Sequence, residues 1–327
     1  MEVGIIGAGG MGRTHSDYLT TIDGVAVTDI VDVDVERARS LASAIGATTY
    51  TEYRTMYSDR GEDLDAVVIT VPPFAHDEQE LLAVEHELPF LVEKPLPLDS
   101  DLAYEIRDAV VAAGLVTQVG YQRRYNAVVE RAMSLIGDRD IAFASGQRQS
   151  SVPDTPWWGE KARSGGQLFE MSTHDFDLLR HFAGEVDTVA AVGGHRVVEE
   201  IDFEDATVAA MRHENGVVSH IGATSAAPDW NSTFVLVGDG FRLEFDYLDG
   251  TLSGCVDGEP VSFETAVTQR QAQAAAFVDA VRADNPALPR SPYPDAVNTF
   301  ELTRAADNAL QRNESIDVTC HDTSVLV

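Results

Sequence analysis

Three glycines near the start of the chain have the spacing of a phosphate-binding turn. Gly7, Gly9 and Gly12 stand in the segment GIIGAGGMGRTH, after an apolar strand pattern and before a helical pattern. In a G-x-G-x-x-G turn, the first glycine permits a tight turn, the second lets a pyrophosphate approach the backbone, and the third allows helix and strand to pack closely. The N-terminus of the helix then attracts the phosphate charge. The pattern predicts a dinucleotide site that also includes Gly10 and Met11.

An aspartate follows this turn at the distance that such a site requires. Asp32 ends the strand pattern VAVTDIVD, about 20 residues after Gly12. A carboxylate at this place accepts hydrogen bonds from the ribose hydroxyls of the adenosine and repels a 2′-phosphate, so we expect NAD. Arg37 lies close enough in the sequence to keep NADP open as a second cofactor. The alternative is that Asp32 merely ends a strand in an aspartate-rich chain.

One lysine stands out because nearly all other positively charged side chains of the chain are arginines. Lys94 lies between Glu93 and Pro95 after the strand pattern PFLV, and the other of the chain's two lysines is Lys161. A lysine amine can exchange its proton when it is buried or lies beside another cation, whereas arginine stays protonated. Lys94 is therefore a candidate for proton chemistry. The alternative is that it is only a surface charge.

The elements that must position these residues change in character along the chain. Short apolar runs alternate with helical patterns over the first 120 residues, which is typical of a parallel sheet covered on both faces. Beyond about residue 140, extended runs are joined by hairpin turns such as Asn215-Gly216. We expect a doubly wound parallel sheet of the Rossmann type over residues 1–122. An α+β domain with a largely antiparallel open sheet should follow over residues 123–327.

Four segments together resemble the Gfo/Idh/MocA oxidoreductases, the glucose-fructose oxidoreductase and inositol dehydrogenase family. They are the Glu93-Lys94-Pro95 motif, TVPPFAH at 70–76, GYQRRYNA at 120–127 and SGGQLFEMSTHDFD at 164–177. The resemblance covers essentially the whole chain. It implies cofactor contacts along the 70–76 loop and the lysine motif, made by Thr70, Pro72, His76, Glu93 and Lys94.

The resemblance also implies the catalytic groups. It places Lys94 at a cleft between the domains, against the cofactor and the hydroxyl that is oxidised. His174 matches the family's catalytic histidine and lies in the first turn of a helical pattern, where the helix dipole disfavours a charged imidazole. Glu170 stands where the family usually has aspartate, so its role is either to orient His174 or to hold a substrate hydroxyl. Otherwise His174 is an ordinary core or surface histidine. Ala127, Pro73 and Ser172 also depart from the family pattern.

Substrate contacts are the least specific of these expectations. Arg123, Trp157 and Trp158 are expected to line the cleft, where the tryptophans either stack on a sugar face or pack in the core. Asp177 is either a substrate contact or an acid on the face of a helix. We expect an NAD-dependent oxidation of a secondary alcohol of a sugar or polyol. The alternatives are an NAD-dependent glycosidase with a transient hydride step, and a non-catalytic NAD-binding sensor.

The composition limits the setting of this chemistry. Acidic residues outnumber basic ones 54 to 23 in the 327-residue chain, giving a formal charge of -31 spread along its length. Molar salt screens the resulting repulsion, so we expect a halophilic protein in a salt-loaded cytoplasm. A surface for basic partners is the alternative. The charge argues against binding nucleic acid, whose phosphates require a basic surface.

The remaining expectations concern localisation, cysteine chemistry and assembly. The start of the chain lacks the pattern of a signal peptide, and no run is apolar enough to span a bilayer, so a soluble cytoplasmic protein is expected. Cys255 and Cys320 are expected to be reduced. The chain shows no zinc-type ligand pattern, and no metal is expected. An open sheet face favours a homodimer or homotetramer.

Overall fold

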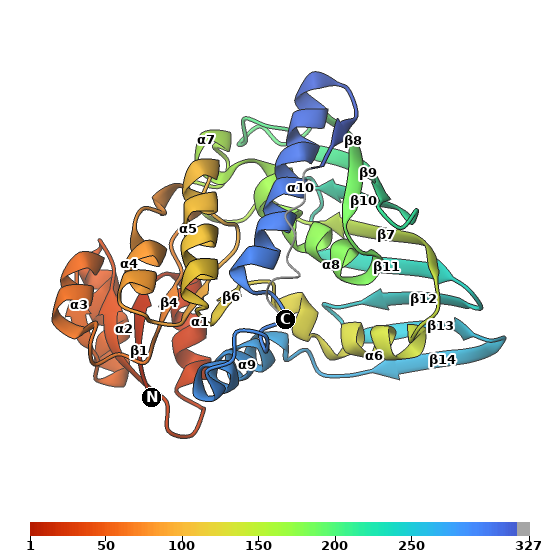
Figure 1. The fold of residues 1–327 in the computed structure, drawn as a ribbon. Coiled ribbons are helices and arrows are strands. Elements are labelled where there is room, and N and C mark those ends of the chain that lie inside the picture. Colours follow the sequence, from red (N-terminus) through yellow and green to blue (C-terminus); the bar gives the residue numbers. More distant parts are fainter. Residues whose placement is uncertain (319–327) are drawn as a thin grey trace. The chain divides into compact units, whose positions relative to one another are not determined.

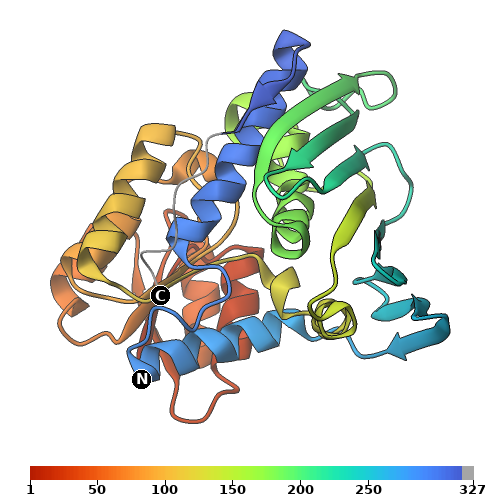
Figure 2. The same cartoon turned by 45° about the vertical axis from the view of Figure 1, so that its right-hand side comes forward.

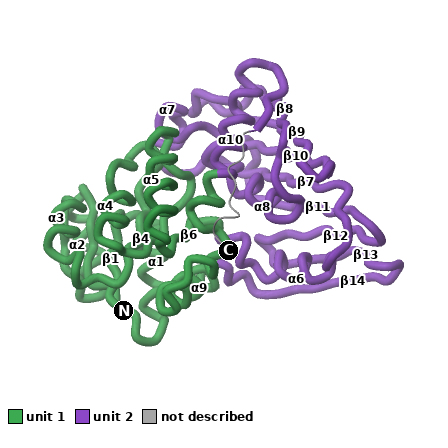
Figure 3. The backbone as a smooth tube through the Cα atoms, viewed as in Figure 1, with its two compact units in different colours: residues 1–121, 270–297, 323–327 green, residues 122–269, 298–322 purple. Residues whose placement is uncertain are grey.

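The computed structural model of the chain describes residues 1–318. Internal contacts divide the chain into two compact units, coloured separately in Figure 3. Unit 1 contains residues 1–121 and 270–297, and unit 2 contains residues 122–269 and those from 298 to the end of the described chain. Each unit has its own sheet and its own hydrophobic core.

The sheet of unit 1 has six parallel strands in the order β3-β2-β1-β4-β5-β6 (Figure 1). Its strands are β1 Glu2–Ile6, β2 Ala26–Val31, β3 Thr48–Tyr50, β4 Ala66–Ile69, β5 Phe90–Val92 and β6 Thr117–Val119. The direction of strand progression reverses between β1 and β4, and ligands of such sheets bind outside the carboxyl ends of the strands at this point. The predicted doubly wound parallel sheet is confirmed.

Helices connect these strands and bury their apolar faces against the sheet. They are α1 Gly10–Leu19, α2 Val35–Ile45, α3 Tyr53–Arg60, η1 Pro73–Ala75, α4 Gln79–Glu85, α5 Ser100–Ala113 and α9 Gln269–Ala283. Helix α2 shows how the local sequence sets the bounds. The Asp34 side chain caps its first turn by accepting the N–H groups of Glu36 and Arg37, and Gly46 ends it in a left-handed conformation.

The contacts of α9 differ from the predicted domain division, which assigned every residue after 122 to the second domain. Ala274, Phe277 and Val278 of α9 belong to the same hydrophobic cluster as Val3 and Ile5 of β1. Residues 270–297 are therefore part of unit 1. A helical pattern reveals that a face is apolar but not which sheet covers that face, so the return of the chain to unit 1 has no local signal.

The sheet of unit 2 has nine strands in the order β14-β13-β12-β11-β7-β10-β9-β8-β15. Every neighbouring pair is antiparallel except β7 and β10, which are parallel. Its strands are β7 Ile141–Gln149, β8 Val186–Gly194, β9 Ala206–His213, β10 Val218–Thr224, β11 Asn231–Gly238, β12 Phe241–Asp246, β13 Thr251–Val256, β14 Glu259–Glu264 and β15 Ile316–Asp317. The predicted largely antiparallel sheet is confirmed.

Helices cover one face of this sheet. They are η2 Gln122–Tyr125, α6 Ala127–Ile136, α7 Lys161–Ser164, the π-helix η3 Gln167–Met171, α8 Thr173–Ala183 and α10 Tyr293–Arg312, whose first residues belong to unit 1. In Figure 2, α8 (light green) and α10 (blue) lie on the same side of the green strands. Leu178 of α8 and Ala306 of α10 share a core with Ala209 of β9 and Leu236 of β11.

Three further observations bear on the expectations from composition. No helix within residues 1–318 is long and apolar enough to cross a membrane. In the same range, no group of three or more His, Cys, Asp or Glu side chains is arranged to hold a metal ion. Cys255 is a free, half-buried cysteine on β13, and Cys320 lies outside the described residues.

Candidate active site

The glycine turn between β1 and α1 has the shape of a phosphate cradle. Gly7 has a φ of +102°, and a Cβ on it would lie 2.7 Å from Thr70 Oγ1. A Cβ on Gly12 would lie 1.9 Å from the carbonyl oxygen of Gly7, so only glycine permits this helix-to-strand packing. By contrast, a Cβ on Gly9 or Gly10 would meet nothing within 4 Å. The backbone between the two tight positions is therefore open, as the approach of a pyrophosphate requires.

The Asp32 carboxylate is fixed beside this turn by backbone donors. Its Oδ2 accepts the N–H of Ala8 at 2.8 Å, and its Oδ1 accepts the N–H of Asp34 at 2.9 Å. Each carboxylate oxygen accepts more than one hydrogen bond, so acceptor positions remain for two ribose hydroxyls. Arg37 lies 3.6 Å from the same carboxylate and is half exposed. The glycine turn and Asp32 together fit a bound dinucleotide.

Thr70 joins the end of β4 to the glycine turn. Its N–H donates to the carbonyl of Ile6 at 2.8 Å, and its hydroxyl donates to that of Gly7 at 2.7 Å. Pro72 follows it and precedes η1. His76 ends this loop with its side chain fully buried, where Nδ1 lies 2.6 Å from Glu80 Oε1 on α4. In this structure the His76 side chain therefore supports the loop from inside unit 1.

The lysine motif lies at the carboxyl end of β5, next to β4 in the sheet. Glu93 is buried, and its Oε1 is 2.8 Å from Nε2 of His15 on α1. Its Oε2 accepts the N–H of Lys94 at 3.2 Å. A Cβ on Gly120 would lie 2.4 Å from the same oxygen, so that glycine leaves room for the carboxylate. These contacts fix the backbone of the half-buried Lys94.

In unit 2, the predicted catalytic residues lie on η3 and at the start of α8. His174 is the second residue of α8 and is 7% exposed. Glu170 of η3 accepts the indole N–H of Trp158 at 2.7 Å through its Oε2. Trp158 is 1% exposed and packs edge-on against Phe203 in a small apolar cluster. Trp157, which is half-buried, packs at the margin of that cluster.

Two buried ion pairs join η2 to α8. Arg123 pairs with Asp175, and its guanidinium lies 4.0 Å from the centre of the Tyr247 ring. Arg124 holds Asp177 through two nitrogens, with Nε 2.9 Å from Oδ2 and Nη2 2.6 Å from Oδ1. All four charged side chains are almost fully buried.

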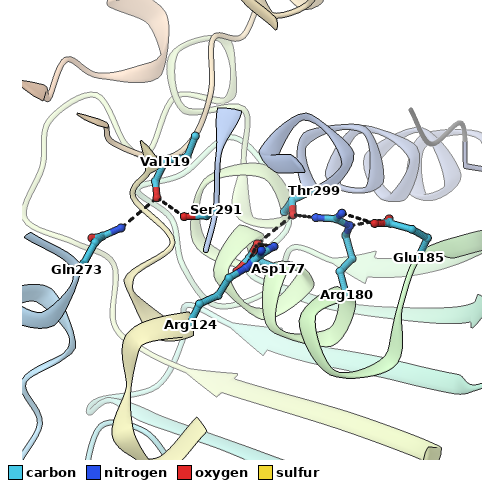
Figure 4. A network of polar contacts seen from close by, with 8 residues as sticks. All are labelled: Val119, Arg124, Asp177, Arg180, Glu185, Gln273, Ser291 and Thr299. Atoms are coloured by element: carbon cyan, nitrogen blue, oxygen red, sulfur yellow. Dashed lines mark hydrogen bonds and ion pairs between the residues drawn. The ribbon is translucent and has the colours of Figure 1, made fainter. Parts of the chain in front are cut away.

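The Arg124–Asp177 pair continues into a network drawn in Figure 4. Asp177 also accepts the hydroxyl of Thr299 at 3.2 Å, and Arg180 donates to Thr299 at 2.7 Å. Arg180 then pairs with Glu185. Asp177, expected to be a substrate contact or a helix-face acid, is therefore the centre of a buried structural network.

Figure 4 also draws a separate network inside unit 1. The carbonyl of Val119, at the end of β6, accepts the side chains of Gln273 at 3.0 Å and Ser291 at 2.8 Å. These bonds tie residues 270–297 to the parallel sheet and agree with the apolar contacts of α9.

Three residues of these arrangements were not predicted from the sequence: His15, Arg124 and Asp175. The only signals in the sequence are the paired arginines of GYQRRYNA and the alternating aspartates of THDFD. Neither pattern states which arginine meets which aspartate, because that depends on how η2 packs on α8.

Comparison with known families agrees with both halves of this description. Residues 1–121 match a family described as "Oxidoreductase family, NAD-binding Rossmann fold". Residues 139–244 match the "GFO/IDH/MocA C-terminal domain". Unit 1 therefore contains an NAD-binding Rossmann domain, and the expected cofactor, NAD, is confirmed.

Curated relatives match part of the chain. The uncharacterized oxidoreductase YrbE of Bacillus subtilis (strain 168) is 30% identical over 224 residues, which are 67% of this chain and 65% of the relative. Inositol 2-dehydrogenase 1 of Paenarthrobacter aurescens (strain TC1) is 32% identical over 195 residues, which are 59% of this chain and 57% of the relative. The matches thus span less than two thirds of these relatives.

Solved structures share the fold over almost the whole length. Levoglucosan dehydrogenase in complex with NADH has a TM-score of 0.87 at 20% identity, with 98% of this chain and 100% of that chain covered. GenD2 from gentamicin A biosynthesis, in complex with NAD, has a TM-score of 0.86 at 23% identity, with 98% and 97% covered.

Proposed function

Because the chain belongs to the Gfo/Idh/MocA family of oxidoreductases, we propose that it oxidises a secondary alcohol of a sugar or polyol with NAD. Inositol 2-dehydrogenase and levoglucosan dehydrogenase among its relatives support this substrate class. The observation that carries the proposal lies in unit 1. Glu93 holds the Lys94 backbone at the end of β5, in the same sheet whose β1 ends at the open glycine turn.

The proposed roles follow from the chemistry of each group. Bound NAD supplies the hydride acceptor. His174 removes the proton of the substrate hydroxyl, and the Lys94 ammonium stabilises the developing alkoxide. Glu170 positions this end of α8, since its carboxylate is fixed by the buried indole of Trp158. Thr70, Pro72 and Glu93 hold the cofactor side of the site, while His76 acts through the loop that it supports.

The geometry of unit 2 changes which residues we propose as substrate contacts. Trp158 is a core residue with its N–H engaged, so we propose no sugar contact for it. Trp157 keeps its proposed contact. Arg123 and Asp177 are proposed to hold α8 through their ion pairs, which makes them positioning residues.

We also propose that a second copy of the chain covers the exposed face of β7, β8, β9 and β10. Val192, Val208 and Val218 on this face are 61%, 46% and 51% exposed. No acidic side chain lines the shallow surface formed by Gln147, Arg148, Gln149, Val192, Gly193, Ala206, Thr207, Val208, Gly222, Ala223 and Thr224, although the chain carries 54 acids. An exposed apolar patch without acidic side chains fits another copy of itself.

The decisive test of the proposed reaction follows two products at once. The purified protein is incubated with NAD and a panel of sugars and polyols, and reduced nicotinamide is measured beside free sugar released from glycosides. We expect net reduction of NAD with an alcohol substrate. Release of sugar without net reduction would identify the glycosidase alternative, and NAD binding without either product would identify the sensor.

A further inference from the structure

Arg148 of β7 is a buried arginine without a carboxylate partner among residues 1–318. It is 5% exposed and lies on the same, helix-covered face of β7 as the buried Ala144. One terminal nitrogen donates to the thioether of Met171 at 2.9 Å, and the guanidinium carbon lies 4.9 Å from the centre of the Trp230 ring. Its Nε is buried with no hydrogen-bond partner. A thioether is only a weak acceptor, so the charge is poorly compensated.

Other buried arginines of unit 2 have their positive charge balanced by a carboxylate. Each of three other buried arginines has a carboxylate within its own unit: Arg123 with Asp175, Arg124 with Asp177, and Arg180 with Glu185. A buried charge is costly unless it is paired and hydrogen-bonded. Arg148 therefore has the environment of a residue whose anionic partner is not part of this chain.

Arg148 contacts the segment that leads into the predicted catalytic end of α8. Its contact Met171 lies three residues before His174, and the next residue, Ser172, has a buried hydroxyl without a partner. Ser150, the first residue after β7, is fully buried, also with an unpartnered hydroxyl. The second carboxylate oxygen of Asp175 has no partner either.

Tyr247 supports this grouping. Burial raises the pKa of the Tyr247 phenol to about 12. The guanidinium of Arg123 opposes this shift, the carboxylate of Asp175 adds to it, and the guanidinium of Arg148 opposes it. Both arginines therefore act on the same phenol as the aspartate at the start of α8.

We propose that Arg148 binds a carboxylate of the substrate, so that the substrate is a carboxylated sugar or polyol. This inference rests on the proposed function and names its substrate class. A guanidinium offers parallel N–H donors that match a carboxylate, and the Ser150 hydroxyl is a further donor. A phosphate dianion would bring two negative charges to one guanidinium in a region that already holds Asp175 and Glu170. A carboxylate, with its single negative charge, matches the single uncompensated positive charge of Arg148.

The test compares sugars that differ only in the charged group. D-Galacturonate and D-glucuronate are compared with D-galactose and D-glucose, and D-galactose 6-phosphate forms a third arm, all at one fixed KCl concentration. We expect one of the acids to exceed its neutral counterpart in kcat/KM by about 10- to 150-fold, as a charged hydrogen bond would give. Preference for the neutral sugar or for the phosphate would overturn the inference.

Variants then assign the preference to Arg148. Arg148→Met should remove most of the ratio between acid and neutral sugar, while Arg148→Lys should keep part of it. The control is Arg212→Met, which removes one positive charge from the solvent-exposed pair with Asp187 and should keep the ratio. An unchanged ratio in Arg148→Met would overturn the inference. So would extensive unfolding of Arg148→Met, because the arginine would then be a structural residue.

Thermal melting separates this inference from the proposed function. Galacturonate or glucuronate should stabilise the unmodified protein bound to NAD but not the Arg148→Met variant. Arg148-dependent stabilisation without turnover would refute the proposed reaction and leave the carboxylate site standing. Turnover of neutral sugars alone, without such stabilisation, would refute the carboxylate site and leave the proposed reaction standing. Absence of stabilisation by either acid, together with absence of turnover of every sugar tested, would refute both.

Discussion

At the scale of single residues, Asp32 has two tasks, one in the glycine turn and one toward the cofactor. Its carboxylate accepts two backbone N–H groups of the turn and is proposed to accept the ribose hydroxyls. Asp32→Asn removes the charge and replaces one acceptor oxygen with an NH2 donor, so it should weaken NAD by about 1.5 to 3 kcal/mol and relax discrimination against NADP. Titration of both cofactors at matched salt measures the effect.

The control for Asp32 is the arginine beside it. Arg37 is half exposed and lies 3.6 Å from the Asp32 carboxylate, so Arg37→Gln should lower the affinity for NADP more than that for NAD. If the unmodified protein binds NADP more tightly than NAD, the proposed preference for NAD is wrong.

Lys94 and His174 are proposed to act on the same hydroxyl, which makes their effects non-additive. Lys94→Ala and His174→Ala should each lower turnover by about 100- to 10,000-fold, and the double variant should lose much less than the product. Lys94→Arg keeps the charge but cannot exchange the proton, so it should recover substantial turnover if charge alone suffices and stay nearly inactive if proton exchange is needed. Single-turnover reduction of NAD with an identified substrate measures each step.

The second lysine of the chain is the matched control. Lys161 pairs with Asp307 at 2.7 Å, and nothing in its surroundings suggests proton chemistry, so Lys161→Ala should keep near-normal turnover. Near-normal turnover in Lys94→Ala would show instead that the lysine of the Glu93-Lys94-Pro95 motif is structural.

The sequence predicted which residue types belong to this site better than it predicted which residues contact one another. The glycines and Asp32 are readable from the sequence because local backbone conformation and spacing define their role. Asp177 and Trp158 are not, since the same aspartate is a surface acid or a buried partner depending on whether an arginine from η2 meets it. Pairing across elements has no local signal.

At the scale of elements, the Arg124–Asp177 pair fastens α8 to η2. Arg124→Met leaves the buried Asp177 carboxylate without its main partner, so it should lower the free energy of unfolding by about 3 to 5 kcal/mol. The double variant Arg124→Met/Asp177→Leu removes both charges and should recover much of that loss. Denaturant unfolding in molar KCl measures all three. A double variant no more stable than Arg124→Met would contradict this account.

The His15–Glu93 contact links α1 to the end of β5 in the same way. His15→Leu leaves Glu93 Oε1 buried without its partner, which should cost about 1 to 3 kcal/mol of stability. Glu93 also accepts the Lys94 N–H, so kcat should fall while NAD affinity changes little. His15→Gln, which can still donate to the carboxylate, should restore most of kcat. Loss of stability without any change in kcat would make the contact purely structural.

The elements themselves were largely predictable, whereas their grouping was only partly so. Continuous apolar strands separated by helices predict β1, β2, β4, β5 and β6, because a parallel sheet is buried on both faces. The short β3, Thr48–Tyr50, has no apolar pattern and was not predicted. Hairpin turns such as Asn215-Gly216 predict the antiparallel sheet, and burial alternates along β9 and β10 as expected for a sheet with one open face. The return of α9 to unit 1 depends on long-range contacts such as that of Gln273 with Val119, which no pattern within α9 reveals.

At the scale of the whole molecule, the surplus of 54 acidic over 23 basic residues should make folding depend on salt. Repulsion among scattered carboxylates is unscreened in dilute buffer, whereas molar salt shortens the Debye length to about 3 Å. The melting temperature should therefore rise strongly between low salt and molar KCl, and activity should rise with it.

An uncharged osmolyte is the control for this dependence. Sucrose at the same osmolarity favours compact states by exclusion from the protein surface but screens no charge, so it should restore much less stability than KCl. The proposed oligomer gives a second readout, since salt screens the repulsion between two acidic copies that meet at the face around Val208. Sedimentation should therefore show a dimer or tetramer at high salt, and Val208→Lys should dissociate it. A melting temperature that is the same in dilute buffer and in molar KCl would refute the halophilic interpretation of the composition.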